Sequence, residues 1–165
     1  MIHHPTGLFH TLAAVVALIA GTFVLLRRKG DLIHKRAGYV YTLAMALLNV
    51  SAFMIYDLWG RLGPFHFAAL VSAATLYMGI RAALRRREGW YEQHYYWMSW
   101  SVVGLYAAFV AEVGVRMVPW GAFWLAVFGA LFAVMAGGSW LIRKNAPHSP
   151  TINPSSSSLT SNPSR

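Results

Sequence analysis

The chain of 165 residues contains no cysteine. This absence excludes disulfide bridges, thiolate zinc sites, thiolate-bound iron–sulfur clusters and cysteine nucleophiles. Charged residues are also scarce, at 12% of the chain, whereas a soluble domain usually has about 25%. The uncharged stretches are about 20 residues long, which is the length that crosses a hydrocarbon core of ~30 Å. The sequence therefore predicts an integral membrane protein.

Acidic residues are the scarcer charged class, because 5 Asp and Glu stand against 14 Lys and Arg, for a formal net charge of +9. The basic residues lie at the ends of the apolar runs, where they set topology and contact anionic lipid. We therefore expect the lipid bilayer as a partner and no nucleic acid. A nucleophile triad, a phosphate-cradling glycine loop, a metalloprotease helix motif and a dinucleotide fingerprint are all missing.

The apolar runs predict an all-α fold with five transmembrane helices in residues 1–144. Their expected ranges are about 6–26, 37–56, 64–84, 95–115 and 120–142. Residues 145–165 are rich in Ser, Pro and Asn. Such a segment cannot bury enough apolar surface to order itself, so we expect a disordered cytoplasmic tail.

The orientation follows from Lys and Arg in the short loops. One side has basic clusters in residues 27–36, 85–87 and 143–144, and the other has only Arg61 and Arg116. The N-terminus is therefore expected outside and the C-terminus in the cytoplasm. Tryptophans fit two interfacial belts: an outer one of Trp59, Trp120 and Trp124, and an inner one of Trp90 and Trp140.

Two apolar runs open alike, with Gly7-Leu8-Phe9-His10 and Gly63-Pro64-Phe65-His66. Each run ends in a basic cluster, which is followed by a second histidine, His34 or His94. This pattern predicts a duplicated two-helix hairpin, with repeat one at about 7–58 and repeat two at about 63–116. The two hairpins would form a four-helix bundle.

The fifth helix, at about 120–142, has no histidine and no acid. Its small residues Gly129, Ala133 and Gly137 recur every four positions, a spacing that lets helices approach closely in lipid. It either packs beside the four-helix bundle as an extra helix or forms the face of a homodimer.

The four histidines of the repeats form an expected outer pair, His10 and His66, and an inner pair, His34 and His94. Paired neutral imidazoles suit haem iron, zinc and copper. The pattern resembles transmembrane diheme b-type cytochromes, which hold one bis-histidine haem near each face of a four-helix bundle. That resemblance implies two haem b groups, with these four histidines as axial ligands. The protein would then be an electron-transfer or oxidoreductase component that exchanges electrons with a redox partner protein or a quinone.

Two features depart from the diheme pattern. His10 lies 17 residues before Arg27, which is about 26 Å along a helix, so the two histidine levels are far apart. With spans that begin near residues 37 and 95, His34 and His94 would also lie in interfacial loops.

Two alternatives remain open. Glu112 lies near the outer end of the fourth span, and a membrane charge is a functional candidate. With His10 and His66 it would make an outer non-haem site for zinc, iron or copper, although Arg116, four residues on, can instead pair with Glu112. The second alternative is a structural or accessory membrane subunit without a cofactor, whose histidines are interfacial.

The run Gly30-Asp31-Leu32-Ile33-His34-Lys35-Arg36-Ala37-Gly38-Tyr39, set between Phe9-His10 and Pro64-Phe65-His66, carries a further likeness. It resembles the small membrane proteins of domain-of-unknown-function family 2306, over about residues 7–116. The resemblance implies a multi-helix bundle in the bacterial inner membrane and no established reaction.

Overall fold

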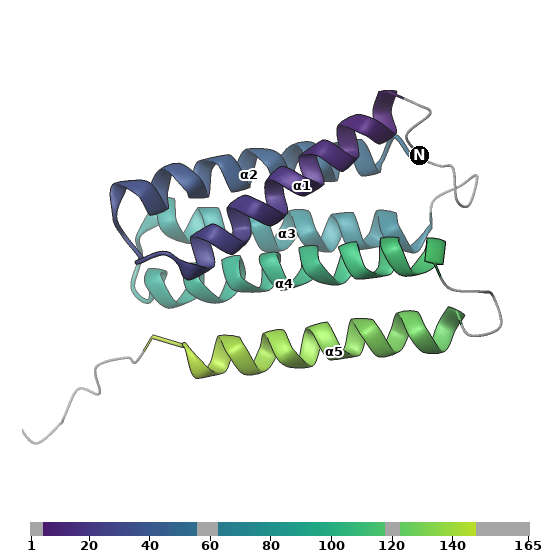
Figure 1. The fold of residues 1–165 in the computed structure, drawn as a ribbon. Helices are drawn as coiled ribbons and strands as arrows, with labels where there is room; N and C mark the ends of the chain where they lie inside the picture. Colours follow the sequence, from purple (N-terminus) through teal and green to yellow (C-terminus); the bar gives the residue numbers. More distant parts are fainter. Residues whose placement is uncertain (1–4, 56–62, 118–122, 148–165) are drawn as a thin grey trace, which may run out of the picture.

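The structure is a computed structural model that describes residues 5–55, 63–117 and 123–147 (Figure 1). Within these ranges it forms five α-helices and no strand. The helices are α1 (Pro5–Leu26), α2 (Leu32–Ala52), α3 (Pro64–Arg85), α4 (Trp90–Met117) and α5 (Phe123–Lys144). The predicted all-α fold with five helices is confirmed. Trp59, Trp120 and most of the expected tail lie outside the described residues, as do the side chains of Arg116 and Trp124.

Four helices, α1, α3, α4 and α5, are long and apolar enough to cross a membrane. The remaining helix, α2, has a similar length of 21 residues but is less apolar. Its first two turns contain Lys35 and Arg36, and Asn49 and Ser51 lie near its end. Because Asn49 and Ser51 are buried, these polar groups face the neighbouring helices.

The first four helices form an antiparallel bundle made of two hairpins. Helix α1 packs along α2 and α3 packs along α4, while α2 contacts α3 and α1 contacts α4. The diagonal partners are therefore α1 with α3 and α2 with α4. Figure 1 shows α5 lying along the outer side of α4. The expected four-helix bundle with one extra helix is thus present.

Two helices start earlier than the hydropathy pattern predicts. Helix α2 starts at Leu32 because Asp31 caps it, accepting a hydrogen bond of 2.6 Å from the His34 backbone N–H. Such a cap satisfies an N–H group that has no partner within the helix. Helix α4 starts at Trp90, after a turn that contains Gly89 at φ +68°. His34 and His94 therefore lie within helices, and their expected placement in interfacial loops is wrong.

The centre of the bundle is filled by side chains. Tyr41 of α2 is fully buried, and its hydroxyl group bonds to Ser101 of α4 across the bundle at 2.8 Å. Gly21 of α1 makes room for this ring, because a Cβ atom there would stand 2.9 Å from Tyr41 Cε2. The small residues Ala13 and Ala17 are buried on the same helix. These small residues therefore give α1 the close approach that their spacing predicts.

The extra helix α5 approaches α4 at small residues on its inner face. A Cβ atom on Gly138 would stand 2.6 Å from both methyl groups of Val103, and one on Gly114 of α4 would stand 3.2 Å from Val127. The predicted stripe of small residues is elsewhere on α5, since Gly129, Ala133 and Gly137 are exposed. Helix α5 thus packs beside the bundle, and dimerisation through it stays a prediction.

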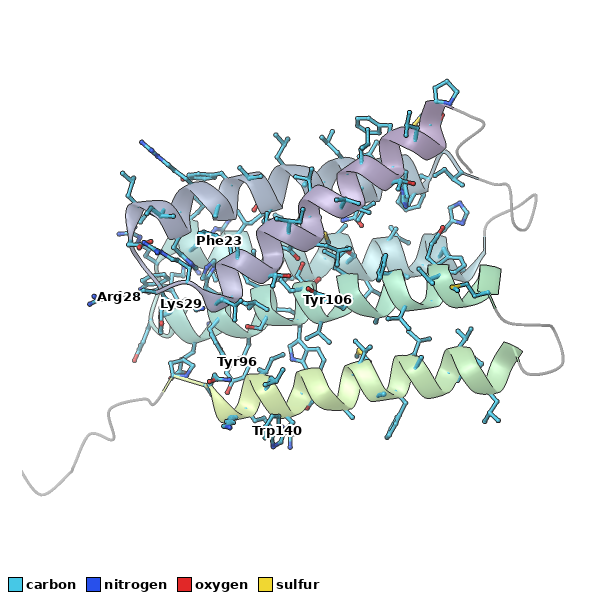
Figure 2. All side chains as sticks on the ribbon, viewed as in Figure 1. Phe23, Arg28, Lys29, Tyr96, Tyr106 and Trp140 are labelled. Carbon is cyan, nitrogen blue, oxygen red and sulfur yellow. The ribbon has the colours of Figure 1, made fainter. Side chains whose placement is uncertain are left out.

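Basic residues gather at one end of the bundle, where α1, α3 and α5 end and α2 and α4 begin. We call this the basic end and the other the opposite end. Figure 2 shows Arg28 and Lys29 at the basic end. Arg86 lies over the Trp90 ring at 5.6 Å, and Lys144 lies over the Trp140 ring at 4.9 Å. The two tryptophans of the expected inner belt therefore lie beside the cations of this end.

Candidate functional site: two histidine pairs at the ends of the bundle

His94 is held by the neighbouring helix of its own hairpin. Its Nδ1 atom lies 2.9 Å from the carbonyl oxygen of Gly79 in α3. A carbonyl oxygen only accepts, so Nδ1 carries the proton and the lone pair of the neutral ring is on Nε2. Gly79 brings the helices together here, because a Cβ atom in its place would stand 2.6 Å from Met98 Sδ and 3.3 Å from the Met98 backbone nitrogen.

His34 lies at the same end of the bundle, in the first turn of α2. Its Nδ1 atom is buried and has no hydrogen-bond partner among the described residues. The Lys29 amino group, in the loop before α2, donates to the Val24 carbonyl oxygen of α1 at 3.2 Å.

Charged side chains in the loop that precedes His34 interact with each other and with the first turn of α2. The backbone N–H of His34 holds the pKa of the Asp31 carboxyl below its ordinary value, and the nearby charge of Arg27 acts in the same direction. Arg27 Nε lies 3.2 Å from Asp31 Oδ2. Partial burial lowers the pKa of the Lys29 amino group. The loop therefore fixes the first turn of α2, which carries His34.

His34 and His94 lie at the same end of the bundle, on the diagonal partners α2 and α4. The His94 ring uses one nitrogen as a donor to a backbone carbonyl, which is the usual second contact of a metal-binding histidine. Beside His34, one helical turn along α2, Gly38 borders open space, because nothing lies within 4 Å of a Cβ atom built there. The basic end thus has one imidazole, His94, oriented by a hydrogen bond, and a second, His34, whose buried Nδ1 has no partner among the described residues.

His66, at the opposite end, has a local structural task. The His66 Nδ1 atom accepts a hydrogen bond of 3.0 Å from the Gly63 backbone N–H. The backbone N–H of His66 donates to the Gly63 carbonyl at 3.0 Å. These reciprocal bonds cap the start of α3. A neutral His66 must then carry its proton on Nε2. The ring also packs against Phe53, with the centroids 5.8 Å apart.

His10 is held by the other helix of its hairpin. Its Nδ1 atom lies 2.9 Å from Ser51 Oγ, and the Ser51 hydroxyl donates to the Leu48 carbonyl at 2.9 Å. Since a serine hydroxyl has one hydrogen, His10 is the donor in the first bond, and its lone pair is on Nε2. Ser51 is only 2% exposed. The two histidines of the expected outer pair therefore present opposite tautomers.

The structure places His10 and Glu112 beside the same cavity. His10 and Glu112 both line a cavity of about 290 Å³ between α1, α2 and α4, and His66 is not part of its lining. Among the described residues, no three His, Asp or Glu side chains gather closely enough to hold a metal ion. The predicted set of His10, His66 and Glu112 is therefore not assembled in these ranges.

A comparison with protein families matches almost the whole bundle. The family described as "Predicted membrane protein (DUF2306)" matches residues 7–145. The chain belongs to this family. The match confirms the resemblance seen in the sequence, and it extends past residue 116 to include α5. With the long apolar helices, membership of DUF2306 shows a membrane protein. No curated protein and no solved structure matches the chain.

Three residues shape these sites without standing out as candidates in the sequence. Asp31 caps the helix of His34, Gly79 accepts from His94, and Ser51 orients His10. Asp31 could have been found by its place three residues before His34, which is the spacing of an N-cap. Gly79 and Ser51 act across a helix–helix contact, so no local pattern pairs them with a histidine.

Proposed function

We propose that the protein is a haem-binding electron carrier of the membrane, with a b-type haem held between His34 and His94 at the basic end. The observation that carries this proposal is the buried Nδ1 atom of His34, which has no hydrogen-bond partner among the described residues, at the same end of the bundle as the His94 ring that the Gly79 carbonyl orients. Among the described residues, no three metal-binding side chains form a group. A structural zinc ion takes four protein ligands and a catalytic one three. A haem brings its own four equatorial nitrogens, so its iron needs only axial ligands from the protein.

The residues around the pair fit such a group. The Gly79 carbonyl holds the His94 ring with its lone pair on Nε2, the atom that would ligate iron. The buried Nδ1 atom of His34, which has no hydrogen-bond partner among the described residues, is the atom of this ring that would ligate iron. A Cβ atom built at Gly38 would meet nothing within 4 Å, so a ring could approach the α2 backbone one turn from His34.

When bound, haem iron would accept and release one electron at a time, and the two histidines would hold it in place. A redox partner protein or a quinone would exchange those electrons. Transfer from one face to the other requires a second haem between His10 and His66. His66 would then have to ligate through Nε2 and give up its hydrogen bond from Gly63, so the second haem would weaken the cap of α3.

The test is a pair of absorption spectra, oxidised and dithionite-reduced, on protein purified in mild detergent, with iron, zinc and copper measured on the same sample. We expect a sharp reduced band of b-type haem and iron near one per chain. His34→Ala and His94→Ala should each remove the band. Colourless protein without iron, expressed with haem supplied, would overturn the proposal.

His66→Ala is the matched control, because this histidine also lies in the first turns of a helix. The variant should keep the band of the haem at the basic end. Iron near two per chain that falls to one in His66→Ala would instead establish the outer haem. Stoichiometric zinc or copper without a visible band, lost in His10→Ala and in Glu112→Ala, would support the non-haem alternative.

A further inference from the structure

The cavity toward the opposite end is lined mostly by apolar side chains. Apart from His10, Thr11 and Glu112, every residue that lines it is alanine, valine, leucine or phenylalanine. It encloses about 290 Å³, whereas a cavity of about 150 Å³ in a protein core is enough for benzene. The volume therefore has room for a segment of one hydrocarbon chain and not for a whole lipid with two chains.

The mouth of the cavity lies on the flank of α1 and α4. Val15 and Phe109 line it and are each 46% exposed, whereas Leu105 lines the interior and is 4% exposed. Both helices are long and apolar enough to cross a membrane, and the chain belongs to a family of membrane proteins. Their exposed flank therefore faces lipid, and the molecules next to the mouth are the hydrocarbon chains of the bilayer.

The cavity has nearly the depth of one leaflet. On α1 its lining runs from His10 to Leu18, which is about 12 Å along the helix. On α4 it runs over the same length, from Val113 back to Leu105. One leaflet of a hydrocarbon core of ~30 Å is about 15 Å deep. Because His10 lies near the start of α1 and Leu18 beyond its middle, this depth belongs to the leaflet at the opposite end.

The two ends of the cavity also differ in polarity. The polar lining residues His10, Thr11 and Glu112 lie at its outer end, whereas Leu18 and Leu105 lie toward the middle of the bundle. A lipid in the leaflet of the opposite end has the same order, with its polar head group outward and its chain end at the midplane. The match concerns polarity along the helices and does not depend on which hydrogen bonds the three polar side chains make.

We propose that this cavity is a specific site for one acyl chain of a phospholipid from the leaflet at the opposite end. The chain end contacts Leu18 and Leu105, and the head group stays outside the cavity, beyond the level of His10. The chain fills volume that water does not favour, because the aliphatic side chains at the inner end offer water no hydrogen-bond partner. The site lies apart from the histidine pair at the basic end and does not depend on the proposed haem.

The probe is a phosphatidylcholine with a photoreactive diazirine near the end of one acyl chain, in nanodiscs that contain the full-length protein. After illumination, tandem mass spectrometry locates the labelled residues. Leu105 is diagnostic, because a side chain that is 4% exposed and lines the cavity is reached by a chain inside it. Ile19 is the reference for bulk lipid, since it is 67% exposed and follows Leu18 at the same depth. We expect label on both residues.

A matched probe carries the diazirine beside the head group instead. The proposed orientation keeps this part of the lipid at the outer end of the cavity, so label on Leu105 should be lost and label on Thr11 should appear. Label on Thr11 from the chain-end probe, without label on Leu105, would mean that the chain enters from the leaflet at the basic end. That result would contradict the proposal.

Two variants test the location. Ala108→Leu fills part of the cavity, and Ala136→Leu makes the same change on the exposed face of α5. Ala108→Leu should reduce the label on Leu105, relative to Ile19, at least about fivefold, as expected for overpacking a filled site. Ala136→Leu should leave this ratio unchanged. Thermal unfolding shows whether each variant is folded, and Ala14→Leu, which fills the cavity from α1, replaces an unfolded Ala108→Leu.

Two results would overturn the proposal. Label on Ile19 without label on Leu105 in the wild-type protein would show that lipid chains pass the mouth without entering, which leaves the cavity to another occupant such as a small ring. An unchanged ratio in a folded variant with a filled cavity would show that Leu105 is labelled by some other route.

Discussion

The adjacent residues Gly137 and Gly138 of α5 allow a sharp test of how this helix packs. Both are glycines in the same turn of one helix, so a change to alanine has the same intrinsic effect on helix formation at each position. They differ only in their surroundings: a Cβ atom at Gly137 meets nothing within 4 Å, whereas one at Gly138 stands 2.6 Å from both Val103 methyl groups and 3.2 Å from Val103 Cβ.

The expected difference follows from these distances. Alanine is favoured over glycine in a helix by up to about 1 kcal/mol, so Gly137→Ala should be neutral or stabilising. At Gly138 the same gain is opposed by overpacking, which typically costs about 1–3 kcal/mol. Val103 is β-branched and nearly fixed in its rotamer within a helix. It cannot turn aside, and α5 must move away from α4.

The measurement is thermal unfolding of both variants in the same detergent. Gly138→Ala should unfold below Gly137→Ala by roughly 2–12 °C, which is the shift for about 1–3 kcal/mol in a protein of this size. Adding Val103→Ala to Gly138→Ala should raise its thermal midpoint, because the overpacking is relieved. Adding Val103→Ala to Gly137→Ala should not raise the midpoint. Identical midpoints for the two glycine variants would refute the proposed contact between α4 and α5.

Four further predictions concern the cap, its pH dependence, the core and the orientation. Asp31→Ala should lower the thermal midpoint and Asp31→Asn should keep it, since both Asp and Asn cap helices; equal losses would argue against the cap. Folding lowers the pKa of Asp31, so the Asp31 carboxylate should stabilise the fold at neutral pH. This stabilisation should decline as pH falls below the ordinary pKa of about 3.9. If acid lowers the thermal midpoints of wild type and Asp31→Asn equally, this expectation is wrong. Tyr41→Phe removes the bond to Ser101 and should cost about 0.6 kcal/mol, the average for such bonds in membranes, in chemical unfolding. A green fluorescent protein fused after Lys144 should fluoresce in bacterial cells, as expected for a cytoplasmic C-terminus, whereas activity of alkaline phosphatase fused there would reverse the orientation.

The helices could be predicted from the sequence because hydrophobic length is a local property. The apolar runs gave α1 and α3 to within one residue at each end. The starts of α2 and α4 could not be found this way, because hydropathy marks the part of a helix that suits lipid. A capped helix continues past that boundary into polar residues, as α2 does from Leu32.

The candidate sites were harder to predict than the helices. The sequence marked His34 and His94 as a pair of ligands, and both lie at the basic end; their role as ligands stays a prediction. It also grouped His10 with His66 by symmetry, whereas His10 shares its cavity with Glu112. Which ring nitrogen carries the proton depends on Ser51 and Gly79, residues brought near only by helix packing. Symmetry in the sequence therefore predicted which residues recur, and tertiary contacts decide what each copy does.

The two copies of the opening motif diverge because their helices begin at different points within it. Pro64 directly follows Gly63 and begins α3, so His66 is the third residue of that helix and its ring reaches back to the Gly63 N–H. Helix α1 begins at Pro5, two residues before Gly7. His10 is thus the sixth residue, beyond the range of N-terminal capping, and its ring bonds across to Ser51. The proline therefore stands at a different distance from the histidine in each copy, and His66 caps its helix whereas His10 lies within its helix and lines a cavity.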